Sequence, residues 1–228
     1  MDLSVREASA RLGVGEWRVR ALVRDGRLRA QRVGRSWLIA EEDVARLSSQ
    51  DSVRGRPLAA ARAWGLLDLL SGGEAPWLSP SARSQVRSLG RALGPSSPDR
   101  LRAALLRRQD NRLCWAHPAA LERLRQASLV AGEAAAVERG VDLVHGAALP
   151  EFYVPAEDWP DLSSRLQIRS GVREPNLVVR LPRVVWPFAD GQVGLAALAA
   201  NLLESGDPRA VEAGMSALRS LARDLGWR

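Results

Sequence analysis

Arginine side chains near the N-terminus have the types and spacing that most clearly indicate a binding chemistry in this chain. If residues 16–24 form a helix, Val19, Leu22 and Val23 occupy one narrow stripe that must face a hydrophobic core. The remaining face is cationic and aromatic, and it consists of Trp17, Arg20, Ala21 and Arg24, with Arg18 on its flank. An arginine fork matches the O6 and N7 acceptors of guanine, and an indole ring can contact the methyl group of thymine. This face therefore predicts contact with base edges in the major groove of double-stranded DNA.

A plain solvated surface is the alternative for these arginines. The chain has 33 basic residues, all of them arginine, so any helix would carry some. Trp17 could likewise pack on a neighbouring element instead of on DNA. The same amphipathic spacing is compatible with both interpretations.

A basic hairpin follows this helix. After Asp25-Gly26, residues 29–39 alternate in polarity as two short strands would, with the bend at Gly34-Arg35. Arginines on a projecting ribbon suit phosphates or a narrow minor groove, where contacts position a protein more than they specify a sequence. The hairpin adds three residues to the predicted DNA-binding set, which are Arg32, Arg35 and Ser36.

Catalytic and metal-binding constellations are missing from the sequence. A nucleotidyltransferase normally holds magnesium through Asp-x-Asp after Gly-Ser, and neither pattern occurs. Zinc needs three or four clustered ligands, whereas the candidates are Cys114, His117 and the distant His145. No glycine-rich phosphate loop is present. We therefore expect a protein that is not an enzyme and has no catalytic residues, metal site or cofactor.

A capping box begins the element that must support the arginine helix. Ser4 and Glu7 have the spacing at which a serine hydroxyl and a glutamate carboxylate satisfy the free amides of a first helical turn. Gly13 provides the flexible backbone for a tight turn into the second helix. Residues 41–47 are expected to close the unit as a short helix, and Trp37 is expected to enter its core.

Residues 3–47 resemble the winged helix-turn-helix domains of MerR-like and excisionase-like proteins. The motifs that carry the resemblance are Glu7-Ala8, Leu12-Gly13-Val14, Arg24-Asp25-Gly26 and the run from Val33 to Ile39. One departure is Gly15, where that family has a capping serine or threonine. The resemblance implies a recognition helix followed by a wing, and hence DNA binding.

Composition is consistent with a polyanionic partner. The formal net charge is +7 and the pI is near 11.1, which favours nucleic acid without distinguishing DNA from RNA. One cysteine excludes an internal disulfide. No apolar run reaches the roughly 18 residues of a membrane span, so we expect a soluble, cytoplasmic protein with no membrane partner.

The remaining residues predict further domains, and the whole chain a multi-domain α+β fold. We divide it into a DNA-binding domain at 1–48, a linker at 49–57, a mainly helical segment at 58–126 and an α+β domain at 127–228 that ends in two helices. The middle segment is either a second winged-helix-like module or a helical connector. In the last domain, short strands are expected near residues 129–131, 143–144, 152–154 and 177–181, and the stripe Val211, Met215, Leu218, Leu221, Ala222 and Leu225 is expected to be buried.

The C-terminal part resembles, more loosely, AbiEi-like type IV antitoxins of GC-rich actinobacteria. The resemblance is carried by residues 140–144, 152–155, 158–162, 176–180 and 201–209. It implies an autoregulating antitoxin that represses its own operon and counters a nucleotidyltransferase-like toxin. Since one winged helix presents one recognition helix, we expect two copies, as a homodimer on DNA, to bind a repeated site. A ligand-responsive MerR-like regulator and an excisionase-like architectural protein remain as alternatives.

Overall fold

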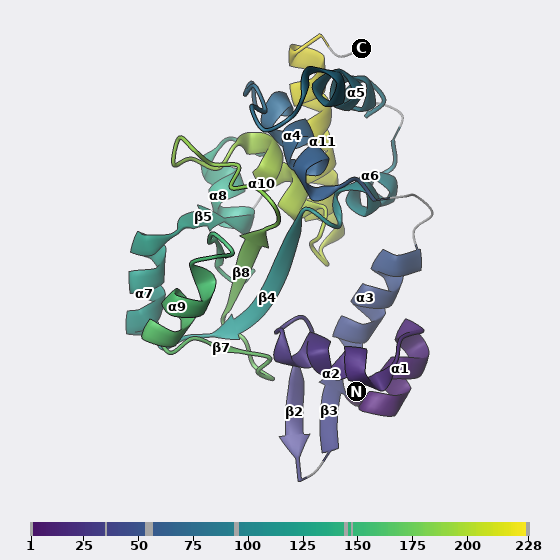
Figure 1. Ribbon diagram of the computed structural model, residues 1–228, viewed down its shortest axis with the longest axis vertical. Coiled ribbons are helices and arrows are strands. Elements are labelled where there is room, and N and C mark those ends of the chain that lie inside the picture. Colours follow the sequence, from purple (N-terminus) through teal and green to yellow (C-terminus); the bar gives the residue numbers. More distant parts are fainter. Residues whose placement is uncertain are drawn as a thin grey trace. The chain divides into compact units, whose positions relative to one another are not determined.

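The computed structural model describes residues 2–34, 36–52, 57–93, 96–143, 146 and 148–226 (Figure 1). Contacts group the chain into two compact units. Unit 1 comprises Met1–Val53, Asn111–Ser128 and Glu151–Leu181, and unit 2 comprises Arg54–Asp110, Leu129–Pro150 and Pro182–Arg228. Both units combine helices with strands, which confirms the predicted mixed fold class. The sequential division at residues 48, 57 and 126 stays a prediction.

The expected helix-turn-helix forms the start of unit 1. Helix α1 (Val5–Leu12) has the complete capping box, in which the Ser4 hydroxyl accepts from the Glu7 amide and the Glu7 carboxylate accepts from the Ser4 amide. Gly13 ends α1 in the left-handed conformation with φ 64°. Helix α2 (Glu16–Arg24) follows after a short turn. The predicted helix boundaries are therefore confirmed.

A three-stranded sheet completes the domain. Strands β2 (Ala30–Val33) and β3 (Ser36–Ala40) form the expected antiparallel hairpin. Strand β1 (Asp2–Ser4) pairs with the other edge of β3, in the order β1-β3-β2, and sequence reasoning did not foresee it. Helix α3 (Glu41–Ser52) continues past Leu47, so the expected linker between residues 49 and 57 is helical up to Ser52.

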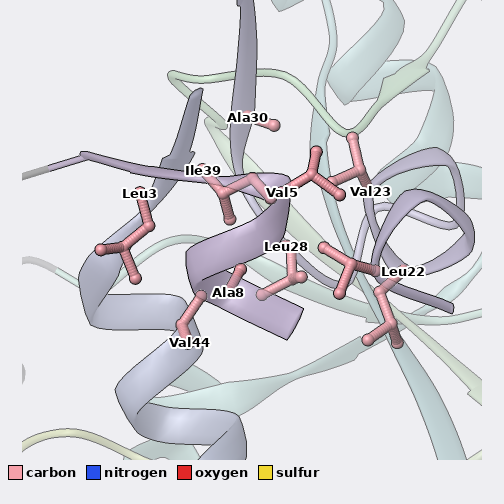
Figure 2. Close-up of a cluster of buried hydrophobic side chains, with 10 residues drawn as sticks. Leu3, Val5, Ala8, Leu22, Val23, Leu28, Ala30, Ile39 and Val44 are labelled. Atoms are coloured by element: carbon pink, nitrogen blue, oxygen red, sulfur yellow. The ribbon is translucent and has the colours of Figure 1, made fainter. Parts of the chain in front are cut away.

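A small hydrophobic core joins these elements (Figure 2). Helices, strands and the wing all contribute to it, through Leu3, Val5, Ala8, Val19, Leu22, Val23, Leu28, Ala30, Ile39 and Val44. Trp37 is partly buried against the cluster, as expected for the inner side of the wing. Because all three α2 residues of the predicted stripe lie in this core, the rotation of α2 about its own axis is fixed by packing.

The rest of unit 1 is a mixed sheet with two helices. Four neighbouring strands of this sheet belong mainly to unit 1, in the order β6-β8-β4-β7. They are β4 (Gln109–Trp115), β6 (Glu151–Tyr153), β7 (Arg169–Ser170) and β8 (Leu177–Pro182). The helices are α7 (Pro118–Ala127) and α9 (Trp159–Arg165). Strand β6 runs parallel to β8, whereas β7 is antiparallel to β4.

Unit 2 is mostly helical. Its elements are α4 (Ala60–Leu70), α5 (Pro80–Arg91), α6 (Pro98–Leu105), β5 (Leu129–Ala131), α8 (Gly132–Glu138), α10 (Leu195–Leu202) and α11 (Pro208–Asp224). The apolar α10 packs against α4, α8 and α11. Helices α5, α6 and α11 each begin with a capping residue followed by proline, at Ser79-Pro80, Ser97-Pro98 and Asp207-Pro208.

Two details of unit 2 correct the sequence-based expectations. In the expected buried stripe of α11, Val211 and Leu221 are only half-buried. Leu225 lies just beyond α11 with 40% of its surface exposed, because the helix ends at Asp224 before the stripe is complete. Leu143 is not part of a strand, and Val144 lies outside the described residues.

Among the helices that the structure describes, none combines the length and hydropathy that a membrane crossing requires.

Candidate nucleic-acid interface

Helix α2 turns a cationic, aromatic surface to solvent. Arg18, Arg20 and Arg24 are exposed, and Trp17 is 73% exposed, which is unusual for so large an apolar side chain. Ala21 is half-buried. The structure thus brings the predicted recognition residues together on one helix, opposite the buried stripe. Their contacts with DNA stay a prediction.

Two of the arginines have acidic neighbours nearby in the sequence. The Arg20 guanidinium is 2.8 Å from the Glu16 carboxylate one turn earlier, and Arg24 is 3.9 Å from Asp25. Exposed ion pairs of this kind are worth about 0 to 1 kcal/mol. Phosphates or base edges could therefore replace these partners at small cost.

The absence of a side chain at Gly15 leaves room for the Trp17 indole. Gly15 is the N-cap of α2 and has no side chain with which to cap the helix. A Cβ atom at this position would lie 3.0 Å from Cδ1 and Nε1 of the Trp17 indole, which is tighter than an ordinary contact. The departure from the family pattern thus leaves room for the indole, a compensation that the sequence did not indicate.

The wing presents a second polar surface. Arg32 and Ser36 are exposed on β2 and β3, and Val33 is 52% exposed beside them. Gly34 has φ 62° at the bend, which a residue with a Cβ adopts rarely. Arg35, the other predicted wing residue, lies outside the described residues.

A charged cluster anchors the base of the wing to α3. Asp43 is 3% exposed and accepts hydrogen bonds from the Arg29 backbone amide at 2.7 Å and from Arg29 Nε at 3.1 Å. A further bond, 2.8 Å long, joins Arg29 to Glu42. The hydrogen bond to Asp43 is the main cause that raises the pKa of Arg29 above its usual value. Sequence reasoning missed this pair, although the acidic run 41–43 at the start of α3 hinted at a basic partner.

Two of the residues considered as zinc ligands, Cys114 and His117, have structural roles. Cys114 is buried with its Sγ 3.4 Å from the Ser170 hydroxyl, and burial raises the pKa of its thiol to about 11. His117 caps α7, since its Nδ1 accepts from the Ala119 amide. His145 lies outside the described residues. Over the described part of the chain, no group of three or more His, Cys, Asp or Glu side chains is placed to hold a metal ion.

Comparison with known proteins agrees with the N-terminal geometry. A family model described as a helix-turn-helix domain matches residues 3–50. Searches among curated proteins and among solved structures gave no match. The matched range includes α1, α2, the wing and most of α3. Residues 3–50 are therefore a helix-turn-helix domain, a fold typical of DNA-binding regulators.

Proposed function

We propose that the protein is a sequence-specific DNA-binding regulator of transcription whose helix α2 enters the major groove. One observation carries the proposal: the face of α2 opposite its buried stripe exposes Trp17, Arg20 and Arg24. The second helix of a helix-turn-helix lies in the major groove, where its exposed side chains contact base edges. Arginines on a projecting wing suit contacts with the backbone phosphates. Arg32 and Ser36 are exposed where such backbone contacts would form.

The charge of the chain supports a nucleic-acid partner. A net charge of +7 attracts DNA at long range, and arginines supply both phosphate contacts and guanine recognition. Since one domain presents one recognition helix, we propose that two copies bind a repeated site. Footprint length against the stoichiometry of the complex tests that part.

Selection of binding sites from random duplex DNA tests the proposal. The full chain should enrich one motif and bind it about a thousandfold or more above scrambled DNA. Enrichment of no motif, with binding that depends on salt but not on sequence, would contradict sequence-specific regulation.

The finer proposal is an autoregulating antitoxin. It rests on the loose C-terminal resemblance and on the lack of a recognisable catalytic motif in the sequence. In this role the protein is not an enzyme, binds its own operator and counters a nucleotidyltransferase-like toxin in the cytoplasm.

Co-expression separates the two activities of an antitoxin. If the adjacent gene encodes a nucleotidyltransferase-like protein, its expression should arrest growth and this chain should restore it. The double variant Arg20→Ala/Arg24→Ala should still restore growth but lose repression of the operon promoter. Growth arrest that the wild-type chain does not relieve would refute the antitoxin role and leave DNA binding intact.

A ligand-responsive regulator is the second candidate, because unit 2 contains a cavity of about 310 Å³. Trp64, Phe188, Asp68 and Asp190 are among its lining residues. Burial is the main cause that raises the pKa of Asp68, and Asp190 adds to the effect. Operator binding that changes on addition of a small metabolite, with no effect of the neighbouring gene product, would favour this role over the antitoxin.

A further inference from the structure

The turn that ends the recognition helix is bonded to a strand outside the helix-turn-helix domain. The Leu113 amide of β4 donates to the Gly26 carbonyl at 2.7 Å. Arg112 Nη1 donates to the Asp25 carbonyl at 2.8 Å, and the same nitrogen lies 3.8 Å from the Asp25 carboxylate. All of these residues belong to unit 1. Two consecutive residues of the turn are thus bonded to two consecutive residues of β4.

The short strand β7 explains why this edge of β4 is open to the turn. Strand β7 pairs with β4 only at Cys114–Ser170 and Trp115–Arg169. Beyond Ser170, the Gly171 amide donates to the Leu113 carbonyl at 3.3 Å, but the Leu113 amide points to Gly26. Leu113 is half-buried, and a backbone amide without a partner away from water is costly, so the turn satisfies a donor that β7 leaves without a strand partner.

Two glycines allow the backbones to approach closely. A Cβ atom on Gly171 would lie 2.3 Å from the Val23 carbonyl oxygen. A Cβ atom on Gly26 would lie 3.0 Å from Ser170 Cβ and 3.1 Å from the Leu113 carbonyl oxygen. Both glycines have positive φ values, 70° and 68°. The backbones therefore approach so closely that Gly171 leaves no space for a side chain, and a Cβ at Gly26 would fit only tightly.

The contact involves the two neighbours in sequence of one predicted base-reading residue, Arg24. Arg24 is exposed, and its two neighbours are Val23, which approaches Gly171, and Asp25, which is bonded to Arg112. A displacement of the turn would therefore displace the backbone that carries the Arg24 side chain. A second contact joins Arg173 to the three-stranded sheet of the helix-turn-helix domain. The Arg173 guanidinium lies 3.4 Å from the Asp2 carboxylate in β1 and donates a hydrogen bond to the Gln31 side chain in β2.

We infer that Arg112, Leu113 and Gly171 are positioning residues for DNA reading. They hold the C-terminal end of α2 against the edge of β4, so residues outside the helix-turn-helix domain set the site preference of that domain. The inference rests on the proposed DNA-binding function. The alternative is that the helix-turn-helix domain reads DNA independently of the rest of unit 1.

Glycine substitutions in the full chain give the sharpest test. Gly171→Ala places a methyl group against the Val23 carbonyl and should force the turn away from β4. Its matched control is Gly191→Ala, because Gly191 has φ 72° and nothing within 4 Å of the added methyl group. Both variants strain the backbone alike, but one of them alone disturbs the contact with α2.

The measured quantity is the affinity for the selected site divided by the affinity for scrambled DNA. Gly171→Ala should lower this ratio about tenfold, the effect of losing one arginine–guanine contact, while Gly191→Ala should leave it unchanged. The loss should concentrate at the base pairs that Arg24→Ala also affects. Hydrogen exchange at residues 21–27 should become faster in Gly171→Ala alone.

A second pair of variants guards against misfolding. Arg112→Met keeps much of the side-chain volume but removes the bond to the Asp25 carbonyl, and the exposed Arg165→Met on α9 is its control. Arg112→Met should lower the ratio in the same direction, and Arg112→Lys should restore part of it. Unchanged ratios in both Gly171→Ala and Arg112→Met would overturn the inference but leave the proposed DNA-binding function in place. A wild-type chain without any site preference would overturn the proposed function, and the inference with it.

Discussion

At the scale of single residues, the Ser4–Glu7 pair shows how a short motif becomes a measurable property. The Glu7 carboxylate accepts from the Ser4 amide and from the Ser4 hydroxyl, at 2.8 and 2.7 Å. Both hydrogen bonds lower the pKa of Glu7, and the bond from the Ser4 side chain has the larger effect. The capping box therefore stabilises α1 most when Glu7 is ionised.

The sign of the pKa shift fixes a pH dependence. A carboxyl group whose pKa is lowered by folding contributes its stability above its unfolded pKa and loses it as the pH falls through the folded value. Glu7→Gln removes this titration but keeps an oxygen acceptor. The wild-type chain should therefore melt at a higher temperature than Glu7→Gln at neutral pH, and the difference should narrow as the pH falls below the ordinary glutamate pKa of about 4.3.

Thermal melts by circular dichroism across this pH range measure the gap. Glu157→Gln, at an exposed position in unit 1, is the control for the loss of one surface carboxylate. A gap between the wild type and Glu7→Gln that stays constant with pH would show that the capping carboxylate does not titrate as the geometry requires.

Residue types alone predicted part of the candidate site. The period of α2 placed Arg20 and Arg24 on the exposed face, since a helix with three apolar residues on one stripe has one way to pack. The fit between Gly15 and Trp17 and the bond between Arg29 and Asp43 could not be foreseen, because each depends on side-chain geometry that spacing does not encode.

At the scale of elements, local signals predicted helices better than strands. Ser4 and Glu7 cap α1 as expected, because a cap acts on the next turn of the same chain. Strands β1 and β7 have three and two residues, and each exists through a partner far along the sequence. The long-range contact between the α2 turn and β4 was invisible for the same reason.

The packing of α10 on α11 gives a prediction at this scale. A Cβ atom on Gly214 in α11 would lie 2.5 Å from the Ala199 carbonyl oxygen and 2.8 Å from Leu202 Cβ. Overpacking costs about 1 to 3 kcal/mol, whereas alanine gains about 0.5 to 1 kcal/mol over glycine within a helix. The steric cost wins, so Gly214→Ala should lower the free energy of unfolding by about 1 to 2 kcal/mol.

Urea denaturation of the full chain checks this value. Gly206→Ala, in the loop between α10 and α11, is the steric control, because nothing lies within 4 Å of the added methyl group and its φ is not positive. The control should unfold close to the wild type. Stabilisation by Gly214→Ala would mean that helix propensity outweighs the steric cost and that α10 and α11 have space to separate.

At the scale of the whole molecule, the chain passes repeatedly between two units. Three separate segments build unit 1 and three build unit 2, an interleaving that composition and linker signals do not reveal. The helix-turn-helix domain shares its unit with strands from the middle and the C-terminal half of the chain. A function that couples DNA binding to the rest of the protein is consistent with this organisation.

The central claim, that the exposed face of α2 reads bases, is tested most directly by binding of the selected site across a salt series. Arg20→Ala and Arg24→Ala should each cost about 1 to 3 kcal/mol on the preferred site and reduce the preference over scrambled DNA. Their salt slope should change little, since loss of a phosphate contact would lower it by about 1. Arg165→Ala, an exposed arginine on α9, should match the wild type. Equal affinity and equal preference in the wild type, Arg20→Ala and Arg24→Ala would contradict the account.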